Sequence, residues 1–529
     1  MHNGAQFLSA DEAVRLIPNG ATLTIGGTGA VLEPDLVLAA LERRFLQTGE
    51  PRDLVSINPM CPSDRPGEGG LNALAHDGML RRIIGGSYLA KRHPSLIRMI
   101  LENRVEAYNL PMGTLVQWFT AVGAGKPGVL TQVGIGSFVD PRVEGGRLNS
   151  RTTENLVEVL TLRGQEYLFY PTFPVDVAII RGTTADQYGN ISMEEEPNTL
   201  GMADIAMAAR NSGGKVIAQV KRVAKRGTLD SRLVRVPAPL VDVVVVHPHQ
   251  TQLTPTTTDV RGGYNPALCG ETRVPFDTIR PLPLDGKKVV LRRAARELRR
   301  GDVVNLGAGL ATELPLVALE EGILEQVTFT NEHGIFGGLM GTAIGTTFVV
   351  ALNAEAIMDS TFQFNFYDGG GIDITFLGVG QLDGAGNNNV SRFGEDIPGC
   401  GGFHNITDRA RRIVFCTFFT AGGLQIEVTD GRLKILREGK HTKLVERVEQ
   451  LTFNAARALA KGQQVVYVTE RAVFRLTAEG LTLVEVAPGV DVERDIRSRM
   501  GCALRVAPDV RPMEAALFRP QPLGLADGI

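Results

Sequence analysis

Cysteine is scarce in this sequence, and its spacing excludes two common kinds of site. The 529 residues include only five cysteines, odd in number and far apart: Cys61, Cys269, Cys400, Cys416 and Cys502. Because no CxxC pair occurs, we expect neither a disulfide framework nor a zinc site. We expect the protein to reside in a reducing compartment. His247 and His249 flank Pro248 without a third ligand at metal spacing, so we predict no metal site.

Long apolar runs and long runs of one charge are also missing. No apolar stretch approaches the ~18 residues that a membrane span needs. The chain does not open with the basic segment and apolar core of a signal peptide. The formal net charge is −3, and without a long run of one sign a nucleic-acid partner is not expected. We therefore expect a cytoplasmic protein that binds neither membranes nor nucleic acids.

The sequence has no GxGxxG after a predicted strand, which argues against a nicotinamide-dependent enzyme. The nearest equivalent is Gly26-Gly27, which follows a predicted strand at 21–25 and precedes a helical pattern at 34–45. This turn weakly resembles a glycine-rich phosphate-binding turn. Gly26 and Gly27 are therefore candidate substrate-binding residues.

The high glycine content, 61 residues, is concentrated at apparent strand ends, as is typical of an α/β protein. Ser9 and Glu12 have the spacing of a capping box at the first helix. The run at 241–246 is apolar apart from Asp242, which fits a sheet buried on both faces. Strands are predicted at 21–25, 54–58, 175–181, 216–220 and 241–246, and helices at 8–16, 34–45, 71–82, 203–211 and 291–300.

Two motifs of the first half recur in the same order in the second half. The segment 301–309 (GDVVNLGAG) resembles 20–28, and 383–389 (DGAGNNN) resembles 186–192. We interpret this as an internal duplication, giving two related α/β domains, each with a mainly parallel sheet. We predict domains at 1–275 and 289–529, joined by a linker at 276–288 within a proline-containing stretch. A site at their interface is the natural expectation.

The stretch 327–345 is the strongest candidate for chemistry. A β-rich run ends on Asn331 and Glu332, and several glycines follow. An exposed carboxylate at the tip of a strand, backed by glycines, can be approached closely by a large ligand. The alternative is an ordinary solvated glutamate in a loop.

A second candidate is the Gly-Cys-Gly-Gly turn at 399–402. Unblocked backbone N–H groups in such a turn, here those of Gly401 and Gly402, can converge on one point and form an oxyanion hole. The alternative is a tight turn between a strand and a helix.

At these residues the chain resembles the family I CoA-transferases, of the acetate/propionate and acyl-CoA:acetate/3-ketoacid type. The resemblance extends over nearly the whole chain. It is carried by the segments 166–171 (EYLFYP), 331–338 (NEHGIFGG), 364–373 (FNFYDGGGID), 386–387, 390–394 (VSRFG), 420–424 (TAGGL), 467–474 (YVTERAVF) and 485–491 (EVAPGVD).

The resemblance implies that Glu332 is a nucleophile that attacks an acyl-CoA thioester and becomes a glutamyl-CoA thioester, with ping-pong kinetics. It implies catalytic roles for Gly401 and Gly402 and a substrate-binding role for Asn387. No ATP, metal or redox cofactor is implied, because coenzyme A is itself a substrate. A homo-oligomer, dimer or tetramer, is also implied.

Two alternatives remain open at this point. An acyl-CoA hydrolase on the same scaffold would use water as the acceptor, and a non-catalytic acyl-CoA sensor would keep only the fold. His333, next to Glu332, either binds phosphate or substrate or merely packs.

The chain departs from the family at Met112. Many relatives have glutamine in the turn that here reads Asn109-Leu-Pro-Met112-Gly113. Methionine cannot donate a hydrogen bond to a substrate carboxylate. We therefore count Met112 as a substrate-binding position, and expect an acid longer or more apolar than acetate, or one held by another group.

Overall fold

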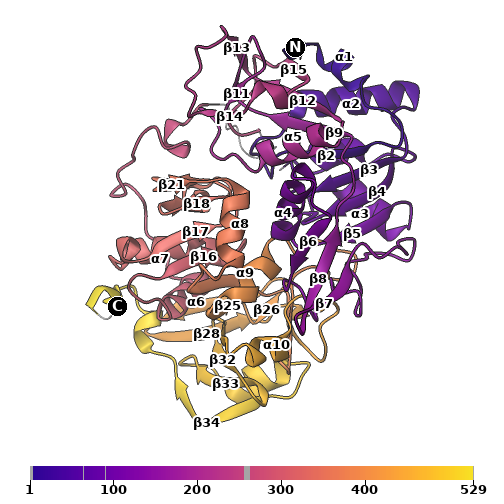
Figure 1. Cartoon of the computed structure of the whole chain (residues 1–529). Coiled ribbons are helices and arrows are strands. Elements are labelled where there is room, and N and C mark those ends of the chain that lie inside the picture. The colour runs from indigo at the N-terminus through magenta and orange to yellow at the C-terminus, as the bar shows by residue number, and fades with distance from the viewer. Residues whose placement is uncertain (1–3, 64, 90, 255–262, 528–529) are drawn as a thin grey trace.

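The computed structural model describes residues 4–63, 65–89, 91–254 and 263–527. They form two α/β halves, coloured indigo to magenta and salmon to yellow in Figure 1. Each half is built around one large sheet, of eight strands in the first half and ten in the second. Within the described ranges, no helix has both the length and the apolar character needed to cross a membrane.

All eight strands of the first sheet are parallel. Alternate side chains face opposite layers: Ile179 packs with α1, α2 and α3, whereas Ile180 packs with α4 and α5. The sheet is therefore covered on both faces, as parallel sheets generally are. In spatial order the strands are β1 (Gln6–Phe7), β15 (Val243–Val246), β12 (Lys215–Val220), β9 (Val177–Arg181), β2 (Thr22–Ile25), β3 (Leu54–Asn58), β4 (Leu80–Gly85) and β5 (Glu106–Asn109), and the helices are α1 (Ala10–Val14), α2 (Asp35–Thr48), α3 (Pro94–Leu101), α4 (Met112–Gly123) and α5 (Met202–Asn211).

The second sheet has five parallel strands at its centre and mainly antiparallel strands at its edges. In spatial order the strands are β21 (Ala356–Ile357), β18 (Ile335–Phe336), β17 (Thr328–Asn331), β16 (Val303–Leu306), β22 (Ile374–Gly378), β25 (Arg412–Cys416), β31 (Gln464–Val468), β32 (Ala472–Thr477), β33 (Gly480–Val486) and β34 (Arg505–Pro512), and the helices are α6 (Gly286–Ala295), α7 (Leu314–Glu320), α8 (Ser360–Asp368), α9 (Phe403–Arg409) and α10 (Ala455–Ala460).

Small sheets decorate both halves. They are formed by β6 (Gly128–Thr131), β8 (Gln165–Pro171) and β7 (Glu158–Leu162); by β13 (Arg222–Ala224), β10 (Thr184–Asp186), β11 (Ile191–Ser192) and β14 (Val234–Val236); by β19 (Leu339–Met340) and β20 (Ala351–Leu352); by β24 (Asn388–Asn389), β23 (Gln381–Asp383) and β30 (Leu444–Val445); by β26 (Thr420–Ala421) and β29 (His441–Thr442); and by β27 (Gln425–Thr429) and β28 (Arg432–Arg437).

The two halves share a topology that is consistent with duplication. The order β15-β12-β9-β2-β3 in the first sheet corresponds to β31-β25-β22-β16-β17 in the second. The two Asp-x-x-Gly-Asn turns also have the same internal bonds. Asn190 Nδ2 donates to Asp186 at 2.9 Å, and Asn387 Nδ2 donates to Asp383 at 3.1 Å.

The α/β fold with parallel sheets, predicted from sequence, is confirmed, and most predicted elements are present. The helix predicted at 71–82 is wrong, because Gly70–Leu74 form a short 3-10 helix and the last three residues of the stretch begin strand β4. The helix predicted at 291–300 begins earlier, at Gly286, after the capping side chain of Asp285 accepts the Lys288 N–H. Helix α6 therefore starts inside the predicted linker 276–288, and the domain limits themselves stay a prediction.

Candidate functional site

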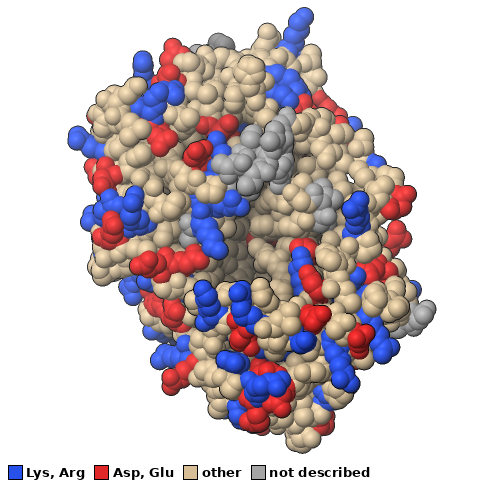
Figure 2. Space-filling view, turned by 180° about the vertical axis from the view of Figure 1, so that it is seen from behind, with Lys and Arg blue, Asp and Glu red and all other residues tan. Residues whose placement is uncertain are grey.

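A cavity of about 510 Å³ lies between the two halves, at the carboxyl ends of parallel strands of the second sheet. Ligands of open α/β sheets bind at this edge. The face in Figure 2 is hollowed between the two halves, and lysine and arginine side chains lie near the hollow. The cavity is lined from the second half by Gly307, Ala308, Glu332, His333, Thr342, 346–349, Leu377, Gly378, Val390, 398–403 and Ile406, and from the first half by Thr28, Gly29, Ser87, Leu89, Arg92 and Met112.

Glu332 enters this cavity because the chain turns sharply after β17. The Asn331 side chain accepts the backbone N–H of His333 at 3.0 Å, and the Asn198 side chain of the first half donates to the His333 carbonyl at 3.0 Å. Gly334 has a φ of +94°, and a Cβ there would overlap the Met358 carbonyl. Glycine is therefore required at this position for the loop to close behind the carboxylate.

The Glu332 carboxylate is buried, with a relative exposure of 9%. The prediction of an exposed carboxylate is therefore wrong, because the first half closes over the end of β17. Burial raises the pKa of Glu332 to about 7, although the nearby Gly402 backbone N–H opposes this rise. A carboxylate that is poorly solvated but held by one donor is poised to react.

The glycine turn presents one backbone N–H to this carboxylate. The Gly401 N–H donates instead to the Gly86 carbonyl at 2.7 Å, and the Cys400 N–H donates to Asn109 at 2.8 Å. The Gly402 N–H faces Glu332, and a Cβ at Gly402 would overlap the Glu332 Oε2 atom. The two predicted glycines thus differ, since Gly401 anchors the turn to the first half while Gly402 contacts the carboxylate.

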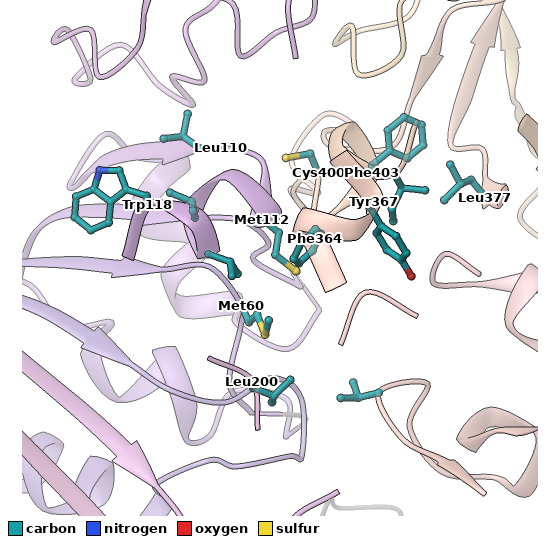
Figure 3. Close-up of a cluster of buried hydrophobic side chains, with 14 of the residues drawn as sticks. Met60, Leu110, Met112, Trp118, Leu200, Phe364, Tyr367, Leu377, Cys400 and Phe403 are labelled. Carbon is teal, nitrogen blue, oxygen red and sulfur yellow. The ribbon is translucent and has the colours of Figure 1, made fainter. Parts of the chain in front are cut away.

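Met112 also lies at this cavity. It is the first residue of α4, its backbone N–H donates to the Gly401 carbonyl at 2.9 Å, and its side chain is buried. Figure 3 shows Met112 of the first half and Phe364 of the second half pointing towards one another. The structure therefore brings Met112 together with Glu332, Gly401 and Gly402.

Gly26 and Gly27 do not line the cavity. A Cβ on Gly26 would overlap Met202, and Gly27, with a φ of +105°, lies against the Leu32 carbonyl. Both glycines are explained by tight packing. The predicted turn still reaches the site, through the next two residues, Thr28 and Gly29.

Asn387 also lies elsewhere, in the turn that repeats Asn190. Its amide donates to Asp383 and its oxygen accepts the Ala455 N–H at 3.0 Å. In the first half, Asn190 accepts the Ala238 N–H at 2.9 Å in the same way. The side chain of Asn387 therefore holds a turn together, and it borders a different cavity from that of Glu332.

His333 lies beside Glu332 with an exposure of 1% and packs edge-on against Phe348, with ring centroids 5.3 Å apart. Burial lowers its pKa to about 3, so its ring is neutral at physiological pH. No group of three or more metal-ligating side chains occurs among the described residues.

Sequence reasoning placed the site between the halves and included Met112, but it missed three other residues of the first half that line the cavity. Ser87, Leu89 and Arg92 follow β4, and parallel strands converge at their carboxyl ends. That rule could have identified these residues from the sequence. The incorrect prediction of a helix at 71–82 prevented this, because it hid strand β4.

It also missed a second cavity of about 420 Å³, which shares Ala308, Gly378 and Val390 with the first and has Lys287 and Lys443 in its wall.

Comparisons with known proteins agree with this geometry. Residues 7–247 match the family model described as Coenzyme A transferase. The chain is 40% identical to a caffeate CoA-transferase of Acetobacterium woodii over 97% of both chains. It is 40% identical to the acetate CoA-transferase YdiF of Escherichia coli K12, over 97% of this chain and 94% of that one.

Solved structures give the same result. The apoenzyme of the acyl-CoA transferase YdiF from Escherichia coli O157:H7 superposes with a TM-score of 0.93 at 38% identity, covering 99% of this chain and 98% of that one. A thioester complex of YdiF with CoA superposes with a TM-score of 0.92, also at 38% identity, covering 98% and 97%.

The burial of Glu332 predicts a stability effect with a defined sign. The folded pKa of about 7 lies above the ordinary value of 4.5, so between these values the folded state binds more protons and stability falls as pH rises. Glu332→Gln removes this penalty. We expect its thermal unfolding midpoint to exceed that of the wild type above pH 7, with the difference shrinking towards pH 4.5.

The matched control is Glu325→Gln, an exposed glutamate before the amino end of β17. Equal thermal unfolding midpoints of the wild type and Glu332→Gln at pH 8 would contradict the conclusion that burial destabilises the ionised Glu332 carboxylate.

Proposed function

This chain is a CoA-transferase, a member of the coenzyme A transferase family, and from that premise we propose that Glu332 is its nucleophile. One observation carries the proposal: a buried carboxylate at the end of β17 lies against the Gly402 backbone inside a cavity that both halves build. We propose that Glu332 carries CoA as a thioester between an acyl-CoA donor and a carboxylic acid acceptor.

The proposed reaction balances without an outside source of energy. The Glu332 carboxylate attacks the acyl-CoA carbonyl and expels CoA thiolate, giving an acyl-glutamyl anhydride. The thiolate then attacks the glutamyl carbonyl, which releases the first acid and leaves a glutamyl-CoA thioester. A second acid reverses the steps. Because one thioester is exchanged for another, the scheme requires no ATP, metal or redox cofactor.

The neighbourhood of Glu332 suits these steps. When thiolate attacks the glutamyl carbonyl, negative charge develops on the oxygen that the Gly402 N–H contacts, so this donor is already placed for the oxyanion. Burial also keeps water from the anhydride, which water would otherwise hydrolyse. We assign Gly401 the role of anchoring the turn, since its own N–H is bonded to Gly86.

We propose that CoA occupies the cavity that adjoins the Glu332 cavity. The shared wall at Ala308, Gly378 and Val390 would let the thiol end reach Glu332. Lys287, which pairs with Glu313 at 2.8 Å, would supply positive charge for the phosphates, whereas Lys443 lies buried in the same wall. Lys443 donates to the Val379 carbonyl at 3.1 Å, and burial lowers its pKa.

The acid is proposed to lie against Met112. The wall there is largely apolar, with Leu89, Phe403 and Ile406 in the same cavity. We therefore propose an acid longer or more apolar than acetate. The names of the two relatives at 40% identity specify caffeate and acetate, so identity alone does not choose between an aromatic and a short acid.

The wider setting follows from the sequence. We propose a cytoplasmic homo-oligomer, a dimer or tetramer, in which acyl-CoA and a carboxylic acid are the small-molecule partners.

Initial-rate kinetics with a panel of acyl-CoA and carboxylate pairs, followed by product mass, test the proposed function. We expect parallel double-reciprocal lines, as a covalent intermediate requires. Glu332→Ala should lower kcat by about 10³-fold or more, the scale seen when a nucleophile is removed. The control Glu325→Ala should keep wild-type kinetics.

Release of free CoA without added acid, at the rate of transfer, would indicate a hydrolase instead. Absence of turnover with every pair would favour a sensor, and either result would overturn the proposal.

The Met112 assignment is tested by Met112→Gln. A glutamine could donate a hydrogen bond to the carboxylate, an interaction worth roughly 1–3 kcal/mol if desolvated. We expect kcat/KM for acetate to rise relative to that for a longer acid such as hexanoate. Met112→Leu, similar in volume and apolar, should keep the wild-type ratio. An unchanged ratio in Met112→Gln would show that the acid does not lie against this residue.

A further inference from the structure

Helix α4 of the first half is capped by the second half. Its own N-cap residue, Pro111, provides no side-chain hydrogen bond, although the first N–H groups of a helix need partners. The Met112 N–H donates to the Gly401 carbonyl at 2.9 Å, and the Gly113 N–H donates to Asn405 Oδ1 at 3.0 Å. Both acceptors belong to the glycine turn and the first turn of α9, so the two elements are held together.

Asn405 is in turn held by Asp368 at the end of α8. Asn405 Nδ2 donates to the two carboxylate oxygens of Asp368 at 3.0 and 3.2 Å. Gln117 of α4 donates to Asp368 Oδ2 at 2.7 Å, which closes a ring of hydrogen bonds between the halves. Burial raises the pKa of Asp368 to about 6, so this carboxyl is ionised at pH 8 and accepts all three bonds.

Phe364 of α8 lies in close contact with the first half beside these hydrogen bonds. A Cβ on Gly113 would overlap Phe364 and Asn405, and one on Gly402 would lie 3.1 Å from Phe364. Figure 3 shows Phe364 between Met112 and the second half. Packing this tight transmits small shifts, because buried side chains have little free volume.

We propose that Asn405 and Asp368 are positioning residues that fix the Gly402 N–H on the Glu332 carboxylate by capping α4 across the interface. Neither residue lines the Glu332 cavity, so neither is assigned a contact with substrate. Gly402 is the N-cap of α9, and Asn405 lies in the first turn of that helix. A shift of Asn405 therefore moves the Gly402 N–H. The inference rests on the proposed role of this N–H in catalysis.

The test exchanges the amide of Asn405 and the carboxylate of Asp368. Asn405→Asp places a second carboxylate against Asp368 and removes the Nδ2 donor. The double variant Asn405→Asp/Asp368→Asn restores three of the four bonds, because the carboxylate now at 405 accepts the Gly113 N–H while the amide at 368 donates to it and accepts from Gln117. Asp368→Asn alone leaves one amide hydrogen without a partner.

At pH 8 we expect Asn405→Asp to lower kcat by about 10- to 100-fold with KM for acyl-CoA changed by less than about 3-fold, as a misplaced catalytic group would. The double variant should recover kcat to within about 3-fold of the wild type. If Asn405→Asp does not fold, the comparison is between Asp368→Asn and the double variant, which should be the more active.

The matched control is Asn149→Asp in the first half. The Asn149 side chain donates to the carbonyls of Ile100 and Val105 at 2.8 and 2.9 Å, away from the Glu332 cavity. It should lower the thermal unfolding midpoint and leave kcat unchanged.

Wild-type kcat in folded Asn405→Asp, or no recovery in a folded double variant, would overturn the positioning role. Failure of the proposed function is separate, because it would appear as an absence of transfer in the wild type or as transfer that survives Glu332→Ala.

Discussion

The close approach of Gly402 to the buried Glu332 carboxylate is the contact on which the rest of this structure depends. Both halves help to place it. The second half supplies both groups, but the first half anchors the glycine turn through Gly86 and Asn109 and holds the loop after Glu332 through Asn198. Burial at the interface raises the pKa of the carboxyl, so the docking of the halves also sets the reactivity of the site.

The two halves differ at the position that Glu332 occupies in the second half. Strand β3 corresponds to β17, and both end on asparagine, Asn58 and Asn331. The next residue is Pro59 in the first half and Glu332 in the second. A proline has no side chain that can act as a nucleophile, so the first half retains the fold while the second retains the reactive group.

The corresponding edge of the first sheet is also filled. Arg181 and Glu196 form a buried ion pair at 3.2 Å, and Gln219 accepts the Leu36 N–H at 3.0 Å. Each charge of such a buried pair requires its partner, because a single buried charge would be strongly destabilising. At the position of Arg181 the second half has Gly378, which lines the cavity.

The parts predictable from sequence were those with a local signal. The apolar run at 241–246 and the strand at 54–58 can be recognised from their own residues. The glycine motifs that recur in both halves indicated the paired topology. Glu332 and the glycine turn were found because unusual residues are adjacent in the chain. The prediction of a helix at 71–82 was wrong because the spacing of its apolar residues fits a helix, whereas its last residues form the start of strand β4 in the sheet.

The rest depends on contacts between residues far apart in the sequence. Asn405 reaches Gly113 across 292 positions, and nothing near either residue indicates the other. The burial of Glu332 and the cavity wall at Arg92 arise in the same way. Asn387 was assigned to the substrate site through the family resemblance, and in the structure its side chain holds a turn whose bonds repeat those of Asn190.

The most direct test of the central claim is to trap the glutamyl-CoA thioester. A thioester carbonyl is far more electrophilic than a carboxylate, so borohydride should reduce it and inactivate the enzyme. The account predicts inactivation only after acyl-CoA is added, not with free CoA or acid alone, and a modified peptide between Arg300 and Arg392 that carries the change at Glu332. An unmodified Glu332 during active transfer, with intersecting-line kinetics, would contradict it.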